Sequence, residues 1–185
     1  MNHLGTKTLE TQRLILRKTA ESDAEPMFEN WANDGRVTKY LTWSPYESAE
    51  QLRESYHRYL LESQQKNDFY DWKIVLKDTD EPIGSIGVVR LREDTGEAEV
   101  GYCLGYAWWH QGFMTEAFTR VIKFLFEEVG VNRIMAKHDP NNPHSGDVMK
   151  KCGLKYEGTL RQAGVNMQGV CDEAIYAILK KDYLE

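Results

Sequence analysis

The two longest helices are predicted by hydrophobic residues that recur every three or four positions. In the stretch 48–65, Ser48 and Gln51 have the spacing of a capping box. Apolar side chains then follow at helical intervals, at Leu52, Tyr56, Tyr59 and Leu60. The stretch 113–129 keeps the same period and is followed by Gly130, a residue type that commonly ends helices. We therefore expect amphipathic helices over 48–65 and 113–129, each with one face on a core.

Two shorter helices have similar signals. The first covers 23–33, where Ser22 or Asp23 is positioned to cap the helix and apolar residues form a stripe along one side. The second covers 144–153 and ends at Gly153.

Short runs rich in β-branched and aromatic residues predict the strands. They lie at 8–17, in a three-strand meander within 69–105, at 133–139, at 154–161 and at 171–180. A hairpin-rich half is thus combined with a half in which strands and helices alternate. This order predicts an α+β or α/β fold with a mixed sheet.

Composition and charge narrow the classes of function. The 185 residues suit one domain, 1–185, and 41% hydrophobic with 28% charged residues is a globular composition. A net charge of −6 argues against nucleic-acid binding, and the sequence has neither a polybasic patch nor an apolar run long enough to span a membrane. The first residues, MNHLGTKTLE, lack the layout of a secretory signal, so we expect a cytoplasmic protein.

The cysteines predict neither a disulfide framework nor a metal site. Cys103, Cys152 and Cys171 are odd in number and widely spaced, and buried free thiols are the expected state. His138 and His144 near Cys152 match no standard ligand spacing, so no metal is expected.

The segment 108–118, WWHQGFMTEAF, places a glycine directly before the predicted helix 113–129. The free N–H groups of a first helical turn and the helix dipole favour an anion, and Gly112 allows a close approach of the backbone. Neither nucleotide-binding glycine motif is present, so another phosphate-containing ligand is indicated. The alternative is that the turn binds no ligand and that Trp108 and Trp109 serve only in packing.

This segment resembles the acetyl-CoA loop of the GNAT superfamily of N-acetyltransferases, in particular the RimJ/RimL-type branch with W-x-x-G-[YF]-[MA]-T-E-A. ETQRLILR (10–17) is similar to that branch's first strand, AEVGY (98–102) to its fourth, and NPHSGDVMKKCGL (142–154) to its N-x-x-S segment and helix end. The resemblance covers the whole chain. It implies a mostly antiparallel central sheet, splayed at the acetyl-CoA site and flanked by about four helices. Met114 and His110 depart from the small residues common at their positions.

The resemblance also implies an activity: transfer of an acetyl group from acetyl-CoA, as co-substrate, to a primary amine by direct attack. A protein N-terminal α-amine, as in a ribosomal protein, is the first expectation for the acceptor. A small amine, such as a polyamine, an amino acid or an aminoglycoside, is an alternative, and so is a non-catalytic acyl-CoA-binding module. The cofactor-binding residues implied are Leu104, Trp109, His110, Gln111, Gly112, Phe113, Met114, Thr115 and Asn142.

Two residues are implied in catalysis. Glu99 corresponds to a glutamate that draws the proton from the amine, and a solvated surface charge is its alternative. Ser145 corresponds to a hydroxyl that returns a proton to the thiolate, and the alternative is that Asn142 and Ser145 cap the helix 144–153. Cys103 lacks a paired histidine and is not expected to be a nucleophile. The acceptor pocket is expected at the helix 48–65 and the strands after residue 154, and the oligomeric state, a homodimer included, stays open.

Overall fold

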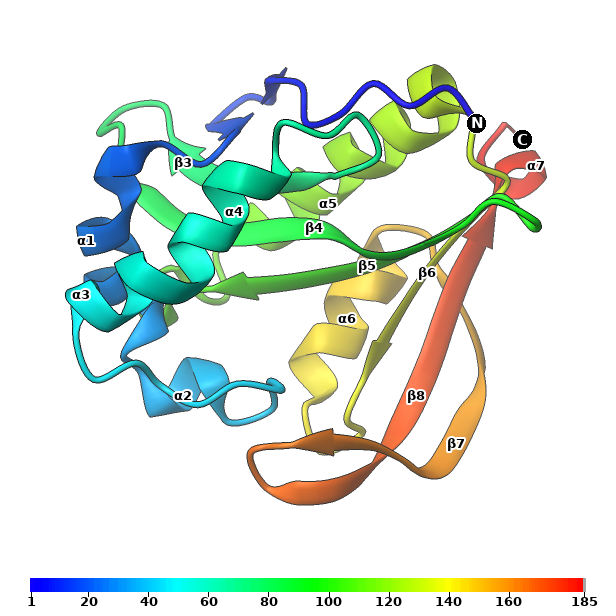
Figure 1. Ribbon diagram of the computed structural model, residues 1–185. Helices are drawn as coiled ribbons and strands as arrows, with labels where there is room; N and C mark the ends of the chain where they lie inside the picture. The colour runs from blue at the N-terminus through cyan, green and yellow to red at the C-terminus, as the bar shows by residue number, and fades with distance from the viewer. Residues whose placement is uncertain (185) are drawn as a thin grey trace.

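A computed structural model describes residues 1–184, which form one eight-stranded sheet with helices on both faces (Figure 1). The strand order is β1-β2-β3-β4-β5-β6-β8-β7, and each neighbouring pair is antiparallel except β5 and β6. The predicted mixed sheet and α+β class are confirmed. The strands are β1 (Leu9–Glu10), β2 (Leu14–Arg17), β3 (Asp71–Leu76), β4 (Pro82–Arg92), β5 (Glu97–Leu104), β6 (Arg133–His138), β7 (Lys155–Asn166) and β8 (Gly169–Leu179).

All four predicted helices are present. Three continue into or through wider π-type turns, so that helical backbone extends over 24–32, 49–63 and 113–129. Short helices at 35–38 and 180–183 were not predicted, because one turn of helix is too short to show a period. The bounds are α1 (Ala24–Met27), α2 (Gly35–Thr38), α3 (Ala49–Leu52), α4 (Arg58–Ser63), α5 (Phe113–Phe124), α6 (Pro143–Lys151) and α7 (Lys180–Tyr183).

Two strand predictions need correction. The expected strand 8–17 is broken into β1 and β2 by a turn in which the Thr11 hydroxyl accepts the N–H of Leu14 at 2.9 Å. The last two strands are longer than expected and form one hairpin, in which the register shifts before Gly158 and again before Gly164. These irregularities and the many polar residues of β7 hide the alternation that marks a strand.

Two clusters of apolar side chains hold the helices on the sheet. The larger lies between the sheet and α5, where Phe118, Val121 and Leu125 are fully buried. The smaller lies under α1, α3 and α4 on the opposite face and includes Trp31 and Leu52. The residues described include no helix with the length and apolar character needed to cross a lipid bilayer.

Candidate active site

Strands β5 and β6 start side by side and then separate, and Figure 1 shows them diverging from a common end. Residues 97–99 of β5 pair with 133–135 of β6, and the rest of β5 has no partner in β6, which pairs along its whole length with β8 on its other side. The Gly105 N–H donates to the Ile83 carbonyl on the β4 side. Since N–H groups alternate in direction along a strand, the Leu104 N–H points the other way, into the gap between β5 and β6. The gap therefore offers a backbone donor.

The loop between β5 and α5 presents a second set of donors. Gly112 precedes the first helical residue and has φ +82°, in the left-handed region that suits glycine, and His110 has φ +61°. Helix α5 begins at Phe113 without a side-chain cap, so the N–H groups of its first turn are free to meet a ligand. Together with the helix dipole, they favour an anion at this turn.

Contacts from the β1–β2 turn hold this loop in place. One carboxylate oxygen of Glu116 accepts hydrogen bonds from the Thr11 hydroxyl (2.6 Å) and the Arg13 backbone N–H (2.8 Å), and the other accepts from Arg13 Nε (2.7 Å). Arg13 also donates to the Gln111 carbonyl and covers the Phe113 ring. Although partial burial acts to raise it, these hydrogen bonds lower the pKa of Glu116 below its ordinary value. The start of α5 is thus fixed to the edge of the sheet.

A cavity of about 650 Å³, here called the first cavity, opens at this turn and at the gap between the strands. It brings together most of the residues implied by the sequence. Those that line it are Leu104, Trp109, His110, Gly112, Phe113, Met114, Thr115, Asn142 and Ser145. Gln111 is exposed outside it and donates to the Ala107 carbonyl.

Cationic and aromatic side chains complete the walls of the first cavity. Arg36, which is paired with Asp34 at 2.6 Å, lines it together with Lys39 and Lys151, and the two lysines can balance negative charge on a ligand. The rings of His110 and His144 meet edge to face with centroids 4.7 Å apart, which joins the loop to α6. The Trp109 indole N–H donates to the Leu104 carbonyl at 2.7 Å, so this tryptophan pins the loop to the end of β5.

Ser145 lies inside the first turn of α6 and contacts β5. Its hydroxyl donates to the Tyr102 hydroxyl at 3.1 Å, and Tyr102 in turn donates to the Ser145 carbonyl at 2.9 Å. Asn142 occupies the cap position, but its side chain makes no capping hydrogen bond. The alternative in which both residues cap the helix is therefore wrong, and Ser145 is free to face the first cavity.

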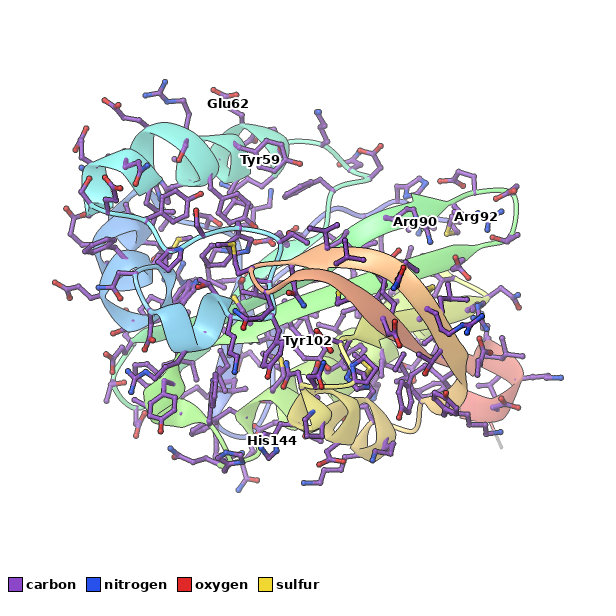
Figure 2. The ribbon with its side chains drawn as sticks, turned by 90° about the horizontal axis from the view of Figure 1, so that it is seen from below. Tyr59, Glu62, Arg90, Arg92, Tyr102 and His144 are labelled. Carbon is purple, nitrogen blue, oxygen red and sulfur yellow. The ribbon has the colours of Figure 1, made fainter. Side chains whose placement is uncertain are left out.

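Tyr102 is a site residue that the motif analysis did not single out. The residue lines the first cavity and also a second one, and it lies between the helix carrying Tyr59 and the helix carrying His144 (Figure 2). Burial raises the pKa of Tyr102 well above its ordinary value, so the phenol keeps its proton at neutral pH. In the sequence, the one feature that could have pointed to Tyr102 is its position at the end of the AEVGY motif. Its contact with Ser145 is seen only in the fold.

The second cavity has a volume of about 610 Å³ and lies over β3, β4 and β5 on the face covered by α4. Its walls include Tyr56 and Tyr59 of the helical segment 49–63 and Val165 and Cys171 of the last hairpin. These are the segments from which the sequence predicts the acceptor pocket. Because Tyr40, Leu41, Tyr102 and Cys103 line both cavities, the two meet at the splayed end of β5.

Glu99 lies on the same face of β5 as Gly101 and Cys103 but does not line either cavity. It is only 6% exposed, so the alternative of a solvated surface charge is wrong. One carboxylate oxygen lies 3.0 Å from an Arg90 nitrogen and the other 3.5 Å from Lys137 Nζ. Both of these cations line the second cavity.

The three cysteines are free, as predicted, but they are only partly buried, so the prediction of buried thiols overstates their burial. Burial of its sulfur raises the pKa of Cys103, and its hydrogen-bond partner is the Ser85 hydroxyl at 3.4 Å, not a histidine. The Cys103 thiol therefore stays protonated and is a poor nucleophile. Within residues 1–184 there is no group of three or more acidic, histidine or cysteine side chains arranged to hold a metal ion.

Comparisons with known proteins agree on one kind of domain. A family model described as an acetyltransferase (GNAT) domain matches residues 13–155. An N-acetyltransferase of Bacillus licheniformis, described as uncharacterized and called p20, is 34% identical over 179 residues, covering 96% of this chain and 98% of its own. The [ribosomal protein uS5]-alanine N-acetyltransferase of Escherichia coli is 29% identical over 162 residues, and this match covers 81% of this chain and 79% of that one.

A solved structure has the same fold. The microcin C7 self-immunity acetyltransferase MccE, in complex with acetyl-CoA and AMP, superimposes with a TM-score of 0.80 at 21% identity, and the match covers 91% of this chain and 93% of that one.

Proposed function

The chain belongs to the GNAT family of acetyltransferases, and on that premise we propose that it moves an acetyl group from acetyl-CoA to a protein N-terminal α-amine. The observation that carries the proposal is the junction of two cavities at Tyr102. One cavity adjoins the free N–H groups of α5, and the other opens under α4. A donor and an acceptor can then approach the same point of β5 from opposite sides.

The first cavity fits a CoA thioester in size and in chemistry. Its volume of about 650 Å³ is in the range of cofactor sites, and its cations and helix N-terminus suit phosphate groups. Bound acetyl-CoA supplies the acetyl group as a thioester. The residues proposed to hold it are those of the turn around Gly112, with Asn142 on the opposite wall.

The chain's own groups then have three roles. The Leu104 N–H, which points into the gap, donates to the carbonyl oxygen where negative charge develops. The Ser145 hydroxyl, which donates to Tyr102 in the structure, turns to give its proton to the leaving sulfur and regains a proton from solvent. Glu99 takes up the proton of the amine, by way of water past Arg90 and Lys137.

An α-amine suits this arrangement better than a lysine side chain. Its reference pKa is about 8, against about 10.4 for lysine, so deprotonating lysine near neutral pH costs roughly 3 kcal/mol more. The similarity to a uS5-alanine N-acetyltransferase supports a protein N-terminus as the acceptor.

The test is CoA release by the purified protein with three kinds of acceptor: ribosomal proteins with free N-termini, short peptides with a free α-amine, and small amines such as 1,4-diaminobutane. We expect turnover with the peptides and proteins, and mass spectrometry of the product should find the acetyl group on the first residue. Turnover with small amines alone would refute the protein acceptor. Absence of turnover with every amine, in a protein that binds acetyl-CoA, would leave a non-catalytic binding module.

A further inference from the structure

A buried ion pair lies on the floor of the second cavity. Lys73 is fully buried in β3, and its ammonium lies 2.6 Å from Oδ1 of Asp71, two residues earlier on the same face of the strand. A buried ammonium needs such a partner, so Lys73 fixes the Asp71 carboxylate in one orientation. Asp71 itself lines the cavity, at the end of β3 nearest α4.

Two glycines let neighbouring groups approach the sheet closely between Asp71 and β5: Asp71 Oδ2 lies over Gly87, and a Val89 methyl group lies over Gly101. Asp71 pairs with Gly87 of β4, and Gly87 pairs with Gly101 of β5, so the three positions form a row across the sheet. A Cβ on Gly87 would lie 2.9 Å from Asp71 Oδ2, which shows that this oxygen leans over β4. Two strand spacings separate Asp71 from Gly101, about 10 Å between Cα atoms. A group held on Oδ2 therefore lies over β4, one strand spacing from Gly101 of β5.

Aromatic side chains enclose the space above this row. Tyr56 and Tyr59 stack with centroids 6.2 Å apart, and Phe69 meets Tyr59 edge to face at 6.0 Å. Tyr56 and Tyr59 both line the second cavity, as Asp71 does. Aromatic faces attract ammonium groups, and their effect adds to that of a carboxylate. The cavity thus combines the second carboxylate oxygen of Asp71, Oδ2, with aromatic side chains.

The arginine and the lysine that line the second cavity are already paired with carboxylates of the protein. Arg90 lies against Glu99, and Lys137 lies against Glu173 at 2.9 Å and against Glu99. Both cations are therefore occupied. The Oδ2 atom of Asp71 is the acidic oxygen that faces the row of glycines.

We propose that Asp71 binds the ammonium group of the acceptor and holds it over β4, one strand spacing from Gly101. The proposal rests on the proposed transferase function, because it assigns the acceptor subsite of that reaction. The ligand chemistry is a primary ammonium at the end of a chain that can lie between aromatic side chains. A peptide N-terminus and a small diamine both offer it, and the experiment separates them.

The experiment measures binding without transfer. With CoA in place of acetyl-CoA no acetyl group can move, so calorimetry on the CoA complex reports amine binding alone. The probes are a hexapeptide with a free N-terminal alanine, its N-acetylated twin, and 1,4-diaminobutane. The variant is Asp71→Asn/Lys73→Met, which removes both charges and leaves no unpaired buried ammonium. Asp71→Asn alone replaces it if the double variant does not fold, since the amide oxygen can still accept from Lys73.

We expect the free-amine peptide to bind the wild-type protein about tenfold or more tightly than its acetylated twin, and the variant to bind the two peptides equally. The matched control Asp68→Asn removes an exposed carboxylate of the same cavity and should keep the preference. A preference that survives in the Asp71 variant would overturn the proposal, as would failure of both amines to bind the wild type. Tighter binding of the diamine than of the peptide would assign the subsite to small amines. Binding without turnover would contradict the transferase function and leave the role of Asp71 intact.

Discussion

The hydroxyl groups of Tyr102 and Ser145 lie 3.1 Å apart at the point where the two cavities meet. Ser145 comes from the first turn of α6 and Tyr102 from the splayed end of β5, so the contact spans the gap between the strands. When the serine gives up its proton, the phenol, which stays protonated because burial raises its pKa, can turn its O–H to donate a hydrogen bond to the serine oxygen until solvent returns a proton to it. The pair is therefore expected to act as a unit.

Substitution of Ser145 by alanine should lower kcat by about a hundredfold and change the affinity for acetyl-CoA much less. A proton for the leaving sulfur matters only as the transition state forms, and positioned acids of this kind contribute about 10² or more. Tyr102→Phe should lower kcat as well, and the double variant should be little worse than Ser145→Ala alone, because groups that act together are not additive. Steady-state kinetics and calorimetry measure the two quantities. Equal losses of kcat and affinity would assign Ser145 a structural role.

A bulky side chain at Gly112 should abolish binding of acetyl-CoA. Gly112→Trp fills part of the first cavity and also strains a backbone with φ +82°. Gly130→Trp is the matched control: its φ is +80°, it ends the helical segment that Gly112 begins, and a Cβ there meets nothing within 4 Å. Both variants should lose about 1 kcal/mol of stability through the strained backbone. Calorimetry should find binding lost in the first alone, and equal affinities would remove the turn from the cofactor site.

The elements predicted best from the sequence are those whose burial follows a simple period. Helical backbone over 113–129 has the predicted bounds because its apolar residues all face one core. The strand predicted at 8–17 fails at Thr11, where a side chain competes for a backbone N–H that a strand would pair with another strand. The sequence does not reveal the full length of β7, because most of its side chains are exposed and its pairing register with β8 shifts twice.

The motif in residues 108–118 correctly predicted most residues that line the first cavity, because the loop and the start of α5 are continuous in sequence. It could not predict the contacts from distant residues that hold the loop and α5 in place. Glu116 meets Arg13 across 103 positions, and Ser145 meets Tyr102 across 43. Asp71 carries no motif, and only the pairing of three strands brings it into line with Gly101. Side-chain pairs of this kind depend on the sheet register, which a single sequence leaves undetermined.

The carboxylate of Glu116 should stabilise the fold in a pH-dependent way. Its folded-state pKa is depressed, so its contribution is present above the unfolded pKa of about 4.3 and is lost as the pH falls through the lower folded value. Glu116→Gln should lower the free energy of unfolding by about 2 kcal/mol at pH 7, since charge-assisted hydrogen bonds to Thr11 and Arg13 are weakened. Denaturant unfolding should show this difference shrinking below about pH 4. The exposed Glu128→Gln is the control, and a loss that does not depend on pH would contradict the role of the charge.

Glu99 provides the last prediction, which concerns the proton that the amine must lose. Glu99→Gln keeps the size of the side chain, so the protein should still fold and bind acetyl-CoA. If Glu99 takes up the proton, the variant should be slow near neutral pH and recover part of its rate as the pH approaches the pKa of the acceptor amine, where the free base is abundant.

The control for this prediction is Glu97→Gln, which changes a similarly buried carboxylate two residues earlier in β5 that is paired with Arg133 at 2.7 Å. Its pH–rate profile should keep the wild-type shape, because Glu97 lies further from the junction of the cavities. Overlapping profiles for the wild type and Glu99→Gln would exclude Glu99 from proton transfer. The two ion pairs with Arg90 and Lys137 would then be its whole contribution, and the proton would leave the second cavity by solvent.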